Sequence, residues 1–401
     1  MDVTAPRHFH NPQSSPARRY GPAESAVLDR AGMAAARHDL EAWPGYAPTP
    51  LLDLAQAAHR LGVGRIWYKD EAHRFGLNSF KAMGAPYAVL RFLRGIIAKR
   101  GGAIDATVGD IAAGKYRDAT RDVVVTSATD GNHGRAVAWG AEVLGCRAVI
   151  YIHEHVSPGR EQAIARYGAE VRRVKGNYDE SVRRCAADAK ANNWQVISDT
   201  SYDGYMAIPR DVMHGYMALA EEAANQLPEG AVPTHALIQA GVGGLAAAFC
   251  AAFWLRWGEQ RPRFVVVEPD KADCCYRSAV AGKPTTTPGD LDTVMAGLAA
   301  GEISPLAWTV LKAGADDFVT LDDEYASRAM RLLAETKPAV VAGESGAAGI
   351  ACLIAAQEHP ALARALGLDG SSRVMLVGSE GATDPELYFK LVGRKPQDVA
   401  R

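Results

Sequence analysis

The chain carries no excess charge of either sign. Its 401 residues include 44 Lys and Arg against 46 Asp and Glu, which leaves a formal net charge of −2. A balance this close to zero produces no net positive field that would attract nucleic acid or an anionic membrane surface. We therefore expect neither of these as a partner.

Long apolar runs are also missing. The longest, residues 245–255, is too short to span a bilayer. Residues 1–24 are polar, contain proline and lack the apolar core of a signal peptide. The sequence therefore predicts a cytoplasmic protein with a partly ordered N-terminal arm.

Cysteine is scarce, and its spacing fits no zinc site. Of the six cysteines, Cys274 and Cys275 are adjacent, so they cannot act as a CxxC pair. We interpret all six as reduced thiols, as is usual in the cytoplasm. No cluster of His, Asp and Glu has the spacing of metal ligands, so we expect no metal site.

What the chain does contain is an α/β rhythm. Hydrophobic residues make up 48% of the sequence, enough for a large core and two domains. Short β-branched runs alternate with helical segments, a pattern that predicts parallel sheets with right-handed crossovers. The predicted strands are residues 123–126, 147–152, 170–174, 195–198, 235–239, 264–268 and 373–377.

Lys81 follows Asn78-Ser79-Phe80 at the start of a helical pattern over residues 81–94. Asn78 or Ser79 is the expected N-cap, and Pro86 favours a regular helix that begins only near Gly84. A structural lysine is not preferred at the positive end of a helix. That position favours a neutral, nucleophilic amine, as a Schiff-base lysine needs. The alternative is a solvated lysine at a helix start.

Two glycine-containing loops each follow a predicted strand. Residues 127–134, Ser-Ala-Thr-Asp-Gly-Asn-His-Gly, suit a substrate carboxylate at a helix N-terminus. The alternative is an ordinary turn capped by Asp130. In either case we expect His133 to be a hydrogen-bonded turn residue and not a base. Residues 239–245, Gln-Ala-Gly-Val-Gly-Gly-Leu, suit a phosphate. The same stretch also approaches the GxGxxG fingerprint of dinucleotide-binding sites, with Ala246 at the position of the last glycine. A dinucleotide site therefore stays open, and Glu268 would be its ribose-binding acid.

A third turn, Gly-Ser-Glu-Gly-Ala-Thr-Asp-Pro over residues 378–385, places the hydroxyl of Ser379 after a late strand. Taken together and in this order, the lysine segment and the three loops resemble the fold-type II, tryptophan-synthase-β-like pyridoxal-phosphate enzymes. Within that group the chain is most similar to the diaminopropionate ammonia-lyases, from about Tyr68 to Pro385. The late turn departs from the family pattern, because Ala382 stands where the family has Asp.

This resemblance implies two α/β domains, each with a mainly parallel sheet, and a cofactor in the cleft between them. The larger domain would comprise residues 1–85 and 213–401, and the smaller one residues 86–212. A homodimer is also implied. Pyridoxal 5′-phosphate would form a Schiff base with Lys81, accept a hydrogen bond from Asn132 at its phenolic oxygen and meet Ser379 at its pyridine nitrogen. The residues implied to cradle its phosphate are Gly241, Val242, Gly243, Gly244 and Leu245.

The implied reaction is elimination of ammonia from D- or L-2,3-diaminopropionate, which yields pyruvate and two ammonia. A cationic β-substituent calls for a nearby carboxylate, and Asp130 and Asp199 match acidic positions of the family. Lys81 would remove the Cα proton of the L-isomer and Asp130 that of the D-isomer. Ser127 and Thr129 would bind substrate beside these two acids.

Three alternatives remain open at the level of the sequence. The first is a serine or threonine dehydratase, or another β-eliminating or β-replacing enzyme of the same family. The second is an NAD-dependent enzyme, and the third is a non-catalytic protein that senses the cofactor. Without the family resemblance, Asp130 reads as a helix cap and Asp199 as a strand-end turn residue.

Overall fold

The computed structural model describes residues 3–129 and 131–399. The chain forms two compact units. The larger comprises Met1–Arg30, Pro48–Ser79 and Leu219–Arg401, and the smaller comprises Ala31–Ala47 and Phe80–Ala218. The division predicted from the sequence differs from these units, because it assigned residues 31–47, 80–85 and 213–218 to the larger domain. Among the described residues, no helix combines the length and apolar character needed to cross a membrane.

The larger unit is built on a seven-stranded sheet with the order β1-β10-β9-β8-β11-β3-β2. The five inner strands run parallel, and the edge strands β1 and β2 pair antiparallel to their neighbours. The strands are β1 (Arg7–His10), β2 (Leu51–Asp53), β3 (Arg65–Asp70), β8 (His235–Gln239), β9 (Arg263–Pro269), β10 (Asp317–Leu321) and β11 (Arg373–Gly378).

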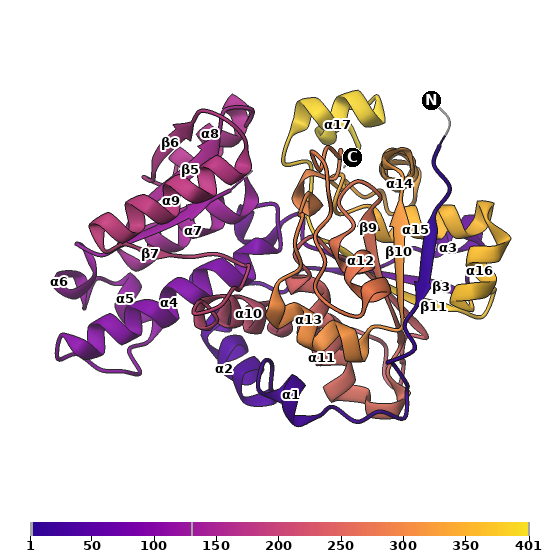
Figure 1. The fold of residues 1–401 in the computed structure, drawn as a ribbon, viewed down its shortest axis with the longest axis horizontal. Coiled ribbons are helices and arrows are strands. Elements are labelled where there is room, and N and C mark those ends of the chain that lie inside the picture. The colour runs from indigo at the N-terminus through magenta and orange to yellow at the C-terminus, as the bar shows by residue number, and fades with distance from the viewer. Residues whose placement is uncertain (1–2, 130, 400–401) are drawn as a thin grey trace. The chain divides into compact units, whose positions relative to one another are not determined.

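Helices cover this sheet and bury its apolar residues. α15 packs against β8, β9, β10 and β11, and α14 lies beside α15 (Figure 1). α11 and α15 are apolar all round and almost wholly buried, as expected for helices inside a core. The helices are α1 (Pro22–Ser25), α3 (Ala55–Leu61), α11 (Gly244–Trp257), α12 (Cys274–Ala281), α13 (Pro305–Gly314), α14 (Asp323–Glu335), α15 (Ala348–Glu358), α16 (Pro360–Leu366), α17 (Pro385–Val392) and α18 (Pro396–Val399), with 3-10 turns η1 (Arg74–Gly76), η2 (Gly258–Gln260) and η3 (Ala296–Leu298).

The smaller unit contains a four-stranded parallel sheet with the order β6-β5-β4-β7. Helices α7 and α9 both pack on β4 and β5. The strands are β4 (Val124–Ala128), β5 (Arg147–His153), β6 (Glu170–Val174) and β7 (Gln195–Val196). The helices are α4 (Lys81–Lys99), α5 (Val108–Ala112), α6 (Arg117–Thr120), α7 (Asn132–Leu144), α8 (Pro158–Ala165) and α9 (Tyr178–Asn192).

Two helices cross the division between the units, α2 (Arg30–Glu41) and α10 (Ala207–Asn225). The α/β class and the parallel sheets are as predicted. The strand expected over residues 195–198 already ends at Val196. The N–H of Ile197 still bonds to the carbonyl oxygen of Thr126 in β4, whereas the N–H of Ser198 bonds to the hydroxyl of Tyr205.

Candidate active site

The lysine segment enters α4 without a side-chain cap at its N-cap residue. Lys81 is the first residue of α4, and the N-cap is Phe80, which is itself in the right-handed helical region. Asn78 has a φ of +53°, and Ser79 forms a β-bridge with Glu380. The predicted N-caps, Asn78 and Ser79, are therefore wrong, because the backbone there is already committed to a turn and a bridge.

Pro86 does not delay the start of α4. It lies inside the helix, in its second turn, and gives up one backbone hydrogen bond. A close contact with α7 accompanies it: a Cβ added at Gly140 would lie 2.9 Å from the Cα of Pro86. The predicted late start near Gly84 is therefore wrong, and Lys81 stands in the first helical turn.

Within the smaller unit, Lys81 forms a hydrogen-bonded ion pair with Asp199, which follows β7. Burial works against the charge of Asp199, but attraction from Lys81 and then from His133 lowers the pKa of that carboxyl below its ordinary value. Asp199 is thus an anion at neutral pH. The alternative, in which Asp199 is only a turn residue, does not account for its ion pair with Lys81.

His133 is the second neighbour of Asp199. Its Nδ1 lies 3.8 Å from Asp199 Oδ2, and its Nε2 lies 2.9 Å from the carbonyl oxygen of Ile197. Since a carbonyl only accepts, Nε2 carries the proton and donates it. Burial lowers the pKa of His133, although the charge of Asp199 acts in the opposite direction. As predicted, His133 is a hydrogen-bonded residue, and it lies in the first turn of α7.

The loop before α7 uses its small polar side chains to hold its own backbone. Thr129 Oγ1 accepts hydrogen bonds from the N–H groups of Gly131 and Gly134, at 3.0 and 3.1 Å. These two bonds occupy the lone pairs of Oγ1 and leave its hydroxyl proton for donation to another group. Ser127 is buried and donates to the carbonyl oxygen of Ala128 at 3.3 Å. Asp130 lies outside the described residues.

Asn132 is the first residue of α7, and its Oδ1 accepts a hydrogen bond from Arg135 Nη2 at 3.1 Å. The oxygen of its amide is thereby turned toward Arg135. Its amide nitrogen is the group that can donate to a ligand oxygen. This polarity fits the predicted hydrogen bond from Asn132 to a phenolic oxygen, which stays a prediction.

The glycine loop of the larger unit has the geometry of an anion cradle. It connects β8 to the N-terminus of α11, a helix whose first eleven residues are all buried. Gly243 has a φ of +89°, and a Cβ there would lie 3.1 Å from the Cβ of Ala307. A Cβ at Gly241 would lie 3.2 Å from the Cα of Leu298. Backbone N–H groups at such a helix start suit a phosphate.

Ser379, the first residue after β11, is buried and lies 2.8 Å from the side-chain nitrogen of Gln239. Gln239 ends β8, directly before the glycine loop. The sequence placed Gln239 in the loop motif but gave it no role. Nothing in the sequence could reveal this contact, because it joins two strands that are 140 residues apart.

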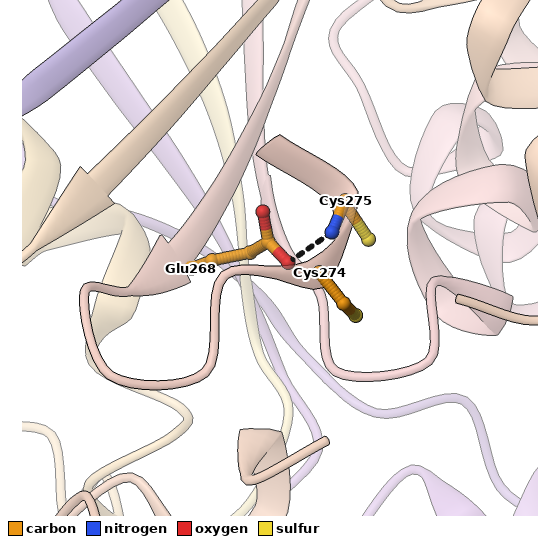
Figure 2. A group of neighbouring side chains, drawn as sticks. All are labelled: Glu268, Cys274 and Cys275. Atoms are coloured by element: carbon orange, nitrogen blue, oxygen red, sulfur yellow. Dashed lines mark hydrogen bonds between the residues drawn. The ribbon is translucent and has the colours of Figure 1, made fainter. Parts of the chain in front are cut away.

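Glu268, Cys274 and Cys275 form a buried cluster next to the glycine loop. Glu268 accepts a hydrogen bond from the N–H of Cys275 at 2.8 Å (Figure 2). It also accepts one from the N–H of Tyr276 at 2.7 Å, and so caps the first turn of α12. The two thiols lie 3.5 and 3.6 Å from the carbonyl oxygen of Gly241. The three side chains bring possible ligand atoms within 4.8 Å of one another, a grouping that the sequence analysis missed.

A buried ion network supports the strand that leads to the lysine segment. Arg74 binds Glu71 at 2.8 Å and Glu222 at 2.6 Å, and Lys69 also pairs with Glu222. Thr49 bonds to Glu71 and accepts from Arg74 at 3.0 Å. Two cations face two carboxylates, so the network carries no net charge while it is intact.

Known proteins identify the family. The profile described as pyridoxal-phosphate dependent enzyme matches residues 42–380. A diaminopropionate ammonia-lyase of Salmonella typhimurium is 39% identical over 360 residues, which cover 87% of this chain and 89% of the relative. The crystal structure of holo diaminopropionate ammonia lyase from Escherichia coli superposes with a TM-score of 0.87 at 35% identity and covers 98% of both chains. A further crystal structure of that enzyme contains an aminoacrylate-PLP azomethine reaction intermediate and superposes with a TM-score of 0.85.

These matches confirm the α/β fold of the fold-type II enzymes. They also explain the glycine loop without the NAD-dependent alternative. Glu268, the acid that a dinucleotide site would need, is occupied in capping α12. The lysine at a helix start, the glycine cradle and the buried hydroxyl have the chemistry that an aldehyde, a phosphate and a ring nitrogen require. The chain therefore belongs to the family of pyridoxal-phosphate dependent enzymes.

Proposed function

We propose that the chain eliminates ammonia from 2,3-diaminopropionate and yields pyruvate and two ammonia. The observation that carries this proposal is the pairing of Lys81 with the ionised, partly buried Asp199. Similarity to diaminopropionate ammonia-lyases over most of the chain supports it. A carboxylate that already binds one cationic nitrogen can bind the cationic β-nitrogen of this substrate in its place.

Pyridoxal 5′-phosphate, when bound to the substrate amine, withdraws electrons from Cα and so makes loss of the Cα proton easier. Lys81 would hold the cofactor, and Gly241, Val242, Gly243, Gly244 and Leu245 would cradle its phosphate. Asn132 would bond to its phenolic oxygen, and Ser379 to its pyridine nitrogen. Thr129 would bind the substrate carboxylate through its hydroxyl proton, and Ser127 would do so once its own proton turns away from the carbonyl oxygen of Ala128.

In the elimination, the amine of Lys81 takes the Cα proton of the L-isomer. The electron pair of that C–H bond forms the Cα–Cβ double bond, and the β-ammonium leaves as neutral ammonia. The resulting 2-aminoacrylate hydrolyses to pyruvate and the second ammonia. Asp130 would take the Cα proton of the D-isomer on the opposite face.

Asp199 would act by exchanging partners. The carboxylate faces the ammonium of Lys81 while that amine is free and protonated. Once the amine of Lys81 is engaged or deprotonated, Asp199 is left to attract the β-ammonium of the substrate. Against the effect of burial, the charge of Lys81 is the main attraction that lowers the pKa of Asp199, and the β-ammonium would take over that effect and keep the carboxyl ionised.

The test is to supply pyridoxal 5′-phosphate with D-diaminopropionate, L-diaminopropionate, serine and threonine separately, and to follow 2-oxo acid release. Pyruvate from diaminopropionate well above that from serine is the expected result. Activity on serine or threonine alone would make the chain a dehydratase. If none of these substrates gives a product although the cofactor is bound, the chain acts on another amino acid or only senses the cofactor. Borohydride reduction and peptide mapping should place the cofactor mass on Lys81, and Lys81→Ala is the control.

The proposal also includes a cytoplasmic location, as expected from the sequence, and a homodimer, which rests on the family resemblance alone. Light scattering of the purified chain during size exclusion would test the assembly. A mass near twice the 42.7 kDa of the chain is expected, whereas a mass of one chain would contradict it.

A further inference from the structure

The carbonyl groups of the glycine loop are held by other parts of the protein, whereas its N–H groups are left for a ligand. The carbonyl oxygen of Val242 accepts a hydrogen bond from the N–H of Ser304 at 2.9 Å, and that of Gly243 accepts one from the N–H of Ala247 at 2.9 Å. Among the described residues, none accepts a hydrogen bond from the N–H of Gly241, Val242 or Gly243. Such N–H groups attract an anion, provided that the loop keeps their direction.

The 3-10 turn η3 packs directly on the first glycine of this loop. A Cβ added at Gly241 would lie 3.2 Å from the Cα of Leu298 and 3.4 Å from the carbonyl oxygen of Gly297. The two backbones touch with no side chain between them, so a shift of η3 would move Gly241 as well. Among residues 282–304, all of which the structure describes, η3 is the only regular element. An irregular segment of this length needs specific contacts to keep one conformation.

Ser345 supplies such a contact. Its Oγ accepts a hydrogen bond from the N–H of Gly297 at 3.1 Å, and the residue is only 2% exposed. The backbone of Ser345 is itself held on both sides, because its N–H donates to Glu380 Oε1 at 3.2 Å and its carbonyl oxygen accepts from Gln239 Nε2 at 3.1 Å. Gln239 ends β8 and Glu380 follows β11, so Ser345 is anchored to the central sheet.

We propose that Ser345 is a positioning residue for the phosphate of the cofactor, because it holds η3 against Gly241 and so orients the N–H groups of the glycine loop. The inference rests on the proposed placement of the phosphate at Gly241–Leu245. Ser345 acts through Gly297 and does not itself contact the phosphate. Without its hydroxyl, the N–H of Gly297 loses its acceptor inside the protein, and η3 is free to move away from the loop.

The experiment compares the cofactor with and without its phosphate. The full chain, freed of cofactor, is titrated with pyridoxal 5′-phosphate and separately with pyridoxal, and each dissociation constant is read from the absorbance of the bound aldehyde. The ratio of the pyridoxal constant to the pyridoxal-phosphate constant measures what the phosphate contributes. Ser345→Ala should lower this ratio by about tenfold, the loss of one hydrogen bond, and should leave the affinity for pyridoxal unchanged.

Ser345→Cys is the second variant and keeps the test decisive if the alanine variant does not fold. It fills the same space with a weaker acceptor, so the ratio should again fall. Ser372→Ala is the matched control. Ser372 is also 2% exposed and accepts one backbone N–H, that of Asp369 at 2.9 Å, but it lies at the opposite end of β11. Its ratio should equal that of the wild type.

The wild-type ratio separates this inference from the placement on which it rests. If the wild type binds both aldehydes equally well, the glycine loop does not hold the phosphate and the placement fails. If the wild type prefers the phosphorylated form but the folded Ser345 variants keep the wild-type ratio, the placement stands and the role of Ser345 is overturned. Equal losses of affinity for both aldehydes would overturn it too, since they would show a general effect on the fold. None of these results depends on which substrate the enzyme consumes.

Discussion

Lys81 and Asp199 lie 118 residues apart and form a hydrogen-bonded ion pair inside the smaller unit. The pair joins the first turn of α4 to the segment that follows β7. It brings the proposed cofactor lysine and a carboxylate that stays ionised into direct contact. Because a substrate with a second amine presents the same kind of cationic nitrogen, this contact carries the argument for diaminopropionate.

Replacing Asp199 should therefore reduce turnover of diaminopropionate more than turnover of serine. Asp199→Asn removes the negative charge and keeps the size of the side chain. We expect kcat/KM for diaminopropionate to fall by about tenfold to a hundredfold, the loss of one hydrogen bond to a charged group. Turnover of serine, whose β-hydroxyl is neutral, should fall much less. Equal losses with both substrates would show that Asp199 acts only by holding Lys81.

Much of the fold follows from local patterns. Helix α9, Tyr178–Asn192, is determined by its own sequence, because Asn177 caps its start and Asn193 ends it in the left-handed region. Strand β8 has the predicted bounds, since its apolar run lies between turn residues. Strand β10 was missed, because Asp-Phe-Val-Thr-Leu is short and the acidic residues that follow it read as a surface turn.

The sequence proposes candidate site residues from local motifs, but it does not predict the contacts that these residues make in the fold. Lys81 and the glycine loop lie in short sequence motifs, and each motif by itself indicates the kind of group that it can bind. The partner of Lys81 and the neighbour of Ser379 depend instead on strands that come together only in the folded sheet. The N-cap at Asn78 or Ser79 was wrong for a related reason. A β-bridge to Glu380, remote in sequence, determines the backbone there.

Asp130 should decide between the enantiomers. If it is the base on the D-face, Asp130→Asn should reduce turnover of D-diaminopropionate far more than that of the L-isomer, for which Lys81 is the base. The ratio of the two kcat/KM values, measured with each pure isomer, is the readout. Similar losses for both isomers would leave Asp130 without a face-specific role.

Gly243 should be required both for stability and for the cofactor. Gly243→Ala places a side chain at a φ of +89°, with its Cβ 3.1 Å from Ala307. The left-handed conformation alone should cost about 1–2 kcal/mol of unfolding free energy, and a shifted loop should weaken cofactor binding. Both are measurable, by urea titration and by the absorbance of the bound cofactor.

Gly62→Ala is the matched control for that strain. Gly62 has a φ of +70°, ends α3 in the same unit, and would place its Cβ in open space. It should lower the free energy of unfolding by a similar amount and leave cofactor affinity unchanged. If both variants bind the cofactor like the wild type, the loop from Gly241 to Gly244 does not need its backbone shape for the phosphate.

Arg74 should be the most sensitive member of the buried ion network. Arg74→Met leaves the carboxylates of Glu71 and Glu222 facing each other with only Lys69 as a cation. Breaking a buried pair in this way should cost about 3–5 kcal/mol of unfolding free energy. Arg60→Met is the control, because the Arg60–Glu335 pair is exposed and 3.4 Å long, so its loss should cost less than about 1 kcal/mol. Comparable losses in urea unfolding would mean that the network does not stabilise the fold.

Glu268 should make the fold less stable as the pH rises. Burial raises the pKa of this carboxyl from 4.5 to about 8, against the lowering effect of the N–H groups of Cys275 and Tyr276. Between these two values the folded chain holds a proton that the unfolded chain has released. The free energy of unfolding must therefore fall with rising pH over this window.

Gln is neutral like the protonated acid, so Glu268→Gln should remove this slope. We expect the variant to gain stability relative to the wild type as the pH goes from 5 to 8, by an amount on the order of a few kcal/mol. Urea unfolding at several pH values provides the measurement. Glu335→Gln, whose side chain is 62% exposed, supplies the matched control and should leave the slope as it is. Parallel stability curves for the wild type and Glu268→Gln would show that Glu268 is already ionised inside the fold, with the two N–H groups of α12 outweighing its burial.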